Sequence, residues 1–152
     1  MATSFRPECT TDCIDKLAGL LKDNSDADMA TLVAPFEDAA QIADPNVVKC
    51  ITDQAGRAIY FSRSVIPYSR DDAGIGGKDM YLRHLGIYAY RRDFLLTITK
   101  KAQTSLELSE KLEQLRAIEC GFSIITAKVR HCWDGIDTPE QYKRFVERTK
   151  KD

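Results

Sequence analysis

Short β-rich runs alternate with helix-like segments along most of the 152 residues, and this alternation constrains the fold more than any other feature. Alternation of this kind is typical of α/β proteins. No repeat or low-complexity block interrupts it, so we interpret residues 1–152 as a single domain. We expect strands at 29–35, 47–52, 57–63, 81–90 and 122–129, and helices at 11–23, 37–42, 104–120 and from 138 onward.

One connection in the middle of the chain predicts an antiparallel element. The runs Val47–Thr52 and Arg57–Arg63 flank Asp53-Gln54-Ala55-Gly56. This spacing indicates a β-hairpin, with the glycine supplying the positive φ of its turn. The sequence therefore predicts a mixed sheet.

The expected helix at 104–120 is the longest of the chain. Thr104 and Glu107 have the spacing of a capping box, and Gly121 is a natural stop. Glu113 and Arg116 lie three residues apart, where they can pair across one turn. The apolar stripe that we expect to face the core consists of Leu108, Leu112, Leu115 and Ile118.

Composition excludes several classes of protein. The hydrophobic fraction is 43%, the charged fraction 30% and the net charge −1, and the isoelectric point is near 6.1. These values are typical of a globular protein and do not favour binding to nucleic acid or to an anionic membrane. We find no leader-like segment and no run of about 18 apolar residues, so we expect a soluble, cytoplasmic protein.

The five cysteines are scattered, and His84 and His131 are isolated from one another. This arrangement does not complete a zinc site, and we expect reduced thiols that act as small apolar side chains.

The strand around His84 is the first candidate site. Because side chains alternate along a strand, His84, Gly86 and Tyr88 share one face, while Leu85, Ile87 and Ala89 form the opposite, apolar face. An imidazole, a bare backbone and a phenol suit the floor of a polar pocket. A solvent-exposed strand face explains the same pattern.

Other polar residues have two interpretations each. Arg63, at the end of a strand, suits bidentate binding of a carboxylate or phosphate, or a surface ion pair. Asp137, ahead of the last expected helix, can cap that helix or bind a divalent cation. Glu113 and Gln114 lie near the apolar boundary of their helix, where a solvated position is the alternative. Gly74-Ile75-Gly76-Gly77 lacks the context of a phosphate-binding loop, and we interpret it as an ordinary loop.

Six segments, in order and with similar spacing, resemble the CMP-Kdo synthetase (3-deoxy-manno-octulosonate cytidylyltransferase) family. The similarity covers residues 12–147, nearly the whole chain. The segments are Asp28-Met29-Ala30-Thr31-Leu32, Pro45-Asn46-Val47-Val48-Lys49, Tyr60-Phe61-Ser62-Arg63-Ser64, Leu82-Arg83-His84-Leu85-Gly86-Ile87-Tyr88, Leu112-Glu113-Gln114-Leu115-Arg116 and Gly135-Ile136-Asp137-Thr138-Pro139-Glu140.

The resemblance implies a Rossmann-like nucleotide-diphospho-sugar transferase fold (glycosyltransferase-A-like). It also implies transfer of CMP from CTP to the sugar acid Kdo, which serves lipopolysaccharide biosynthesis, and a homodimer paired through the hairpin and the His84 strand. The residues that it places in the sugar-acid pocket are Arg63, His84, Tyr88, Glu113 and Gln114. Arg63 would hold anionic oxygen during catalysis, and Asp137 would bind Mg²⁺. A related activity on another sugar acid, such as sialic acid, and a non-catalytic sugar-acid-binding or dimerisation module are the alternatives.

The 152 residues also depart from the family pattern. Relatives carry a glycine-containing basic loop that cradles the triphosphate and a Gly-Asp-Glu-Pro segment that supplies a second metal ligand. Neither segment occurs in this sequence. The resemblance therefore implies a fold truncated at its N-terminus, an exposed sheet edge, and a chain that is inactive alone.

Overall fold

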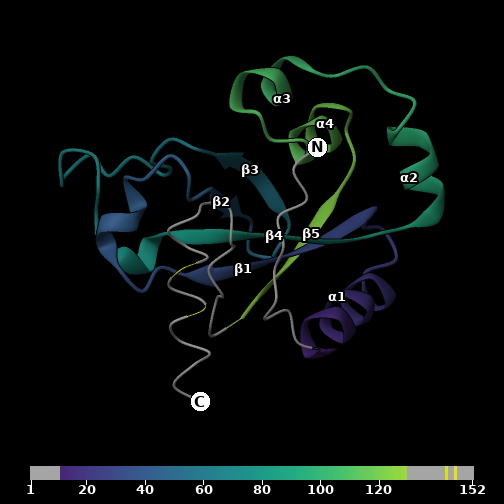
Figure 1. Ribbon diagram of the computed structural model, residues 1–152, viewed down its shortest axis with the longest axis horizontal. Coiled ribbons are helices and arrows are strands. Elements are labelled where there is room, and N and C mark those ends of the chain that lie inside the picture. The colour runs from purple at the N-terminus through teal and green to yellow at the C-terminus, as the bar shows by residue number, and fades with distance from the viewer. Residues whose placement is uncertain (1–10, 130–142, 144–145, 147–152) are drawn as a thin grey trace.

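The computed structural model describes residues 11–129 together with 143 and 146. These residues form a mixed α/β fold in which helices cover both faces of one sheet (Figure 1). The helices are α1 (Thr11–Asp23), α2 (Arg92–Ile98), α3 (Ser105–Glu110) and α4 (Gln114–Glu119). The strands are β1 (Met29–Pro35), β2 (Lys49–Thr52), β3 (Ala58–Ser62), β4 (Leu82–Tyr90) and β5 (Ile124–Lys128).

The sheet is mixed, as the sequence predicts. Its strand order is β3-β2-β4-β1-β5. Strand β1 pairs in parallel with β5 and antiparallel with β4, while β2 pairs antiparallel with both β3 and β4. Every residue of β1 from Met29 to Ala34 is buried, because its neighbours and the helices enclose it on all sides.

The predicted hairpin connects β2 to β3, and its turn reaches across to the far strand of the sheet. Gly56 has a φ of +82°, as expected for the turn glycine. Strand β2 pairs with β4 at Lys49 and Cys50 alone. The Gly56 carbonyl accepts hydrogen bonds from the backbone (2.8 Å) and the hydroxyl (2.7 Å) of Thr126 in β5. The hairpin thus links the two ends of the sheet.

Strand β4 contains a bulge opposite β1. Thr31 pairs with Tyr88 and its neighbour Leu32 with Leu85, so three steps along β4 correspond to one step along β1. The bulge adds two residues, and two residues preserve the alternation of side chains. His84 and Tyr88 consequently remain on one face of the sheet, as predicted.

Two apolar clusters separate the layers. Helix α1 packs Cys13 and Leu17 against a cluster that includes Leu85, and Ile87 and Ala89 pack at its edge. The opposite face of the sheet carries the second cluster, to which α2 contributes Phe94 and α4 contributes Leu115. Figure 1 shows α1 on one side of the sheet and α3 and α4 on the other. The face of β4 that was predicted to be apolar is therefore core, against α1.

The single long helix predicted over 104–120 is wrong. The chain forms two short helices, α3 and α4, with Lys111 between them in the left-handed region at φ 55°. Leu108, which the stripe assigned to the core, is 45% exposed, whereas Leu112 and Leu115 are buried. The break lets α3 and α4 turn toward each other, and tertiary contacts of Glu107 and Glu110 hold it in place.

The helix expected at 37–42 is a short 3₁₀ turn at Ala39–Ile42. Gly121 ends α4 as predicted, with Phe122 N–H bonding the Ala117 carbonyl and Gly121 N–H that of Ile118. Helix α2 was not predicted. Of the helix expected from Thr138 onward, the described residues include only Lys143 and Val146, and both are helical. None of the helices in the described part of the chain has the length and apolar character needed to cross a membrane.

Candidate functional site: a pocket between the β4 strand and helix α4

A pocket of about 140 Å³ lies between the sheet and helices α2 and α4. It brings together residues from β1, from the consecutive elements β4 and α2, and from α4. Three of the predicted site residues line it: Tyr88 from β4, and Glu113 and Gln114 from the start of α4. The wall also contains Tyr90, Phe94 and Arg116. Aromatic rings beside a carboxylate, an amide and a guanidinium form a surface suited to a polar ligand with a hydrocarbon skeleton.

Gln114 forms the most informative part of the wall. Its side chain is 5% exposed, and its Nε2 group has no hydrogen-bond partner among the described residues. A buried amide donor without an acceptor is costly, so such groups usually mark a place where a ligand or water binds. Gln114 can therefore donate to a hydroxyl or carboxylate oxygen in the pocket.

Glu113 lines the same pocket and is exposed. Burial and, to a lesser extent, the Glu113 carboxylate raise the pKa of Tyr90 above its ordinary value. Tyr90 is thus a neutral phenol near neutral pH and can donate a hydrogen bond.

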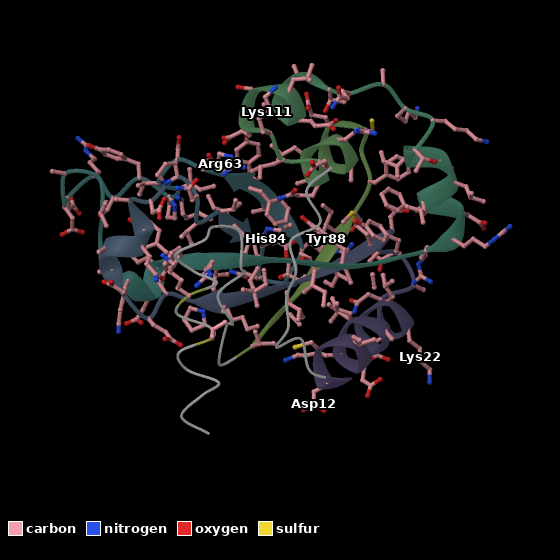
Figure 2. All side chains as sticks on the ribbon, in the orientation of Figure 1. Asp12, Lys22, Arg63, His84, Tyr88 and Lys111 are labelled. Atoms are coloured by element: carbon pink, nitrogen blue, oxygen red, sulfur yellow. The ribbon has the colours of Figure 1, made fainter. Side chains whose placement is uncertain are left out.

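His84 lies next to this pocket and is 9% exposed. Its ring centroid lies 5.5 Å from that of Tyr88 and 4.7 Å from that of Phe61, and Figure 2 shows His84 and Tyr88 adjacent on β4. The aromatic contacts continue from Tyr88 to Tyr90 and on to Phe94. The surface-strand interpretation of His84 is therefore wrong, because the imidazole is enclosed in an aromatic row that leads into the pocket.

Thr31 contacts His84 and was not singled out from the sequence. Its hydroxyl lies 3.0 Å from His84 Nε2 and is buried in β1. On that face of β1 its neighbours are Met29 and Val33, both members of the apolar cluster. A lone hydroxyl in an otherwise apolar strand needs a partner, and this pattern was the available signal.

Arg63 occupies a different place, at the junction of β3 with α3 (Figure 2). Its guanidinium donates to the backbone carbonyls of Glu110 (2.7 Å), Pro45 (3.0 Å) and Lys111 (3.4 Å). These bonds leave at most two of its five donors for a ligand. Arg63 is not among the residues that line the pocket.

Glu110 holds the same junction from the other side. Its carboxylate accepts a hydrogen bond from the Ser62 hydroxyl at 2.6 Å and from the Arg63 backbone N–H at 2.9 Å. From the sequence alone, Glu110 is one of several acidic residues on the expected helix, with nothing to distinguish it from the others. Its role depends on the break at Lys111, which cannot be seen from the sequence.

The predicted pairing of Glu113 with Arg116 is replaced by a different ion pair. Arg116 donates to Glu107 through Nε at 2.6 Å and through a second, shorter contact. Glu107 is 2% exposed. The hydrogen bond with Arg116 lowers the pKa of Glu107 and raises that of Arg116. The pair joins α3 to α4 and fixes the helix that carries Gln114.

Asp137, the predicted magnesium ligand, lies outside the described residues. Within the described part of the chain no three histidine, cysteine, aspartate or glutamate side chains are grouped as metal ligands. Cys50 and Cys120 form no disulfide among the described residues.

Comparison with known proteins connects this geometry to a family. A family model described as cytidylyltransferase matches residues 7–125. The chain is 42% identical over 146 residues to the 3-deoxy-manno-octulosonate cytidylyltransferase of Rhodopirellula baltica, covering 93% of this chain and 58% of that protein. Its counterpart in Solibacter usitatus is 47% identical over 116 residues, covering 76% and 45%.

A solved structure described as CMP:2-keto-3-deoxy-manno-octonic acid synthetase complexed with CTP has a similar fold. The TM-score is 0.81 at 35% identity, covering 91% of this chain and 55% of that chain. The chain thus spans about half the length of the relatives that it matches. Since the family model covers most of its residues and the fold agrees, the chain belongs to the cytidylyltransferase family.

Proposed function

We propose that the chain supplies the sugar-acid-binding part of an enzyme that transfers CMP from CTP to 3-deoxy-D-manno-octulosonate (Kdo), giving CMP-Kdo and diphosphate. The observation that carries this proposal is the pocket that unites Tyr88, Glu113 and Gln114. The names of the relatives and the CTP complex of the structural neighbour support the same reaction.

The reaction forms one bond and breaks another at the α-phosphorus of CTP. The anomeric hydroxyl of Kdo attacks that phosphorus, the bond to diphosphate breaks, and the hydroxyl proton passes to solvent. Such a transfer depends mainly on the positions of the reactants and on neutralisation of charge. In this scheme the pocket residues orient the sugar, since Gln114 donates to an oxygen and Tyr88 provides a ring and a hydroxyl.

Arg63 is proposed to hold an anionic oxygen of the reactants, and its fixed position supports this role in part. Three of its donors hold the backbone at the β3–α3 junction, which keeps the guanidinium in one orientation. Arg116 is the guanidinium that lines the pocket itself, although Glu107 neutralises it.

Magnesium would neutralise phosphate oxygens in this reaction, and Asp137 is the residue proposed to bind it. No cluster of metal ligands occurs in the described ranges 11–129, 143 and 146.

A homodimer is part of the proposal. The hairpin and the loop after β3 expose several large apolar side chains, among them Ile59 at 54% and Tyr68 at 70%, and exposed apolar patches often mark contacts between chains. A non-catalytic binding or dimerisation module fits the same surface. Formation of CMP-Kdo for lipopolysaccharide would place the protein in the cytoplasm, where CTP is available.

Calorimetric titration of the 152-residue chain with Kdo, and separately with CTP and magnesium, tests the proposal. We expect Kdo to bind. Gln114→Met should weaken binding by about tenfold, because it removes the buried donor. Gln54→Met, in the exposed hairpin turn, is the matched control and should leave affinity unchanged. Absence of Kdo binding, or equal loss in both variants, would contradict the assignment of the pocket. Sialic acid in place of Kdo tests the alternative substrate.

A further inference from the structure

Arg116 is the only positively charged side chain among the described residues that line the pocket. It reaches the pocket from α4, and its side chain is 20% exposed. Its guanidinium holds Glu107 with two donors, Nε at 2.6 Å from Oε2 and Nη2 in a shorter contact with Oε1. Glu107 is not among the residues that line the pocket. Arg116 therefore connects a buried carboxylate to the pocket.

Three of the five donors of Arg116 are left for a ligand. A guanidinium carries five N–H groups in one plane, and Glu107 occupies the edge formed by Nε and Nη2. Both hydrogens of Nη1 and the second hydrogen of Nη2 have no hydrogen-bond partner among the described residues. One hydrogen of Nη1 and one of Nη2 are parallel at the end of the group. This second fork matches the spacing of the two oxygens of a carboxylate.

A further donor on the same helix lies in the same wall. Gln114 is 5% exposed, and its Nε2 group has no partner within the described part of the chain. Phe94 and Leu95 line the pocket as well, and apolar neighbours strengthen hydrogen bonds to a charged acceptor. The acidic residue of the wall, Glu113, is exposed, so water reduces any repulsion between its side chain and an anionic ligand.

We propose that Arg116 binds the carboxylate of the sugar acid through the fork of Nη1 and Nη2, while Gln114 Nε2 donates to a neighbouring oxygen of the same molecule. Glu107 then has a second role, because it orients the guanidinium with which it pairs. Since the pair is neutral overall, the preference for an acid comes from the direction of these hydrogen bonds. This inference rests on the proposed function and names the side chain that recognises the acid group of the ligand.

Calorimetric titration of the 152-residue chain with Kdo and with its carboxamide tests this role, because the amide has the size of the acid but no negative charge. We expect the wild type to bind Kdo about tenfold more tightly than the amide. Arg116→Met alone would leave Glu107 buried without its partner. The guanidinium is therefore removed in the double variant Glu107→Gln with Arg116→Met, in which the preference should fall to within about twofold.

Arg116→Lys provides the same test with the ion pair retained. Lysine keeps a positive charge beside Glu107 but has no second fork, so the preference for the acid should fall to about threefold or less. Arg92→Gln is the matched control, because this arginine of α2 is 85% exposed and does not line the pocket. It should leave the preference at about tenfold. Full preference for the acid in the double variant or in Arg116→Lys would overturn the inference.

Sialic acid, a second sugar acid, separates this inference from the proposed function. If sialic acid binds and Kdo does not, and the preference over its own carboxamide is lost in the double variant, the assignment of Kdo is contradicted and the role of Arg116 stands. If Kdo and its amide bind the wild type equally well, the role of Arg116 is contradicted and the proposed function stands. If neither acid binds, both are overturned.

Discussion

Glu107 of α3 and Arg116 of α4 form a buried ion pair across the break that separates the two helices. Both helices are only six residues long, too short to be stable through their own hydrogen bonds. The ion pair holds α3 and α4 together where the backbone of a continuous helix is interrupted. It therefore determines where α4 begins and, with it, the position of Gln114.

A double-mutant cycle of Glu107→Gln and Arg116→Met should reveal strong coupling. Each single change leaves a polar or charged partner inside the protein, so each should lower the free energy of unfolding by about 3 kcal/mol. The double variant should lose much less than the sum. Urea denaturation measures the four values, and strict additivity would show that the two groups do not interact.

The same pair predicts a response to acid. Because hydrogen bonding to Arg116 lowers the pKa of Glu107 below its ordinary 4.5, its stabilising contribution is fully present above that value. The contribution is lost as pH falls through the lower pKa of the folded state. The stability difference between wild type and Glu107→Gln should thus shrink below pH 4.5, as measured by urea denaturation across pH. A constant difference down to the acid transition would exclude this source of stability.

Gly56 should be among the positions least tolerant of alanine. Its φ is +82°, and a Cβ atom there would lie 3.3 Å from the Thr126 carbonyl oxygen. We expect Gly56→Ala to lower the free energy of unfolding by about 1–2 kcal/mol. Gly19→Ala is the comparison, since a Cβ at this position in α1 meets nothing within 4 Å. That variant should be neutral or stabilising by up to about 1 kcal/mol. Equal effects at the two positions would contradict the strain argument.

Lys49 is a buried lysine whose ammonium group donates to three backbone carbonyls, those of Asp44 (3.0 Å), Val47 (2.8 Å) and Arg63 (2.6 Å). Burial lowers its pKa. Lys49→Met would leave three carbonyls without a donor, and thermal or urea unfolding should show a loss of about 3 kcal/mol. The exposed Lys78→Met should change stability by less than about 0.5 kcal/mol. A loss at Lys49 no larger than at Lys78 would show that the carbonyls find other donors.

Cys50 should be nearly inert toward thiol reagents. Burial raises its pKa to about 12, so only about one thiol in ten thousand is ionised at pH 8. Mass-spectrometric mapping after alkylation of the native chain should show slower modification at Cys50 than at the half-buried Cys120. In denaturant the two should react at similar rates. Rapid native labelling of Cys50 would mean that β2 opens readily.

Much of the sheet could be predicted from the sequence because local pattern and burial agree there. Residues 29–35 have the same bounds in the prediction and in the structure, since a run of apolar and β-branched side chains leaves no alternative. The turn at Gly56 was also predictable from the sequence, because glycine is the residue type that best suits its positive φ.

The helical region after β4 was not predictable in this way. The sequence from Thr104 to Cys120 has the periodicity of one amphipathic helix, but Glu107 and Glu110 make contacts with Arg116 and with the end of β3. The contacts of Glu110 reach residues about 47 positions earlier in the chain, and the contact of Glu107 crosses the break between α3 and α4. The candidate site shows the same division. The strand pattern suggested His84 and Tyr88, and the family resemblance named Glu113 and Gln114 as well, whereas Thr31 and the place of Arg63 emerged only from three-dimensional proximity.

The hydrogen bonds between Gly56 and Thr126 connect residues 70 positions apart, and they have a consequence for the order of events during synthesis. Strand β5 must leave the ribosome before either the parallel edge of β1 or the tip of the hairpin finds its partner. Contacts of such long sequence separation form slowly, so the edge of β1 and the hairpin turn stay unpaired until β5, a strand of five residues, has been synthesised. A nascent chain halted before residue 124 would expose both edges at once and be the form most dependent on chaperones.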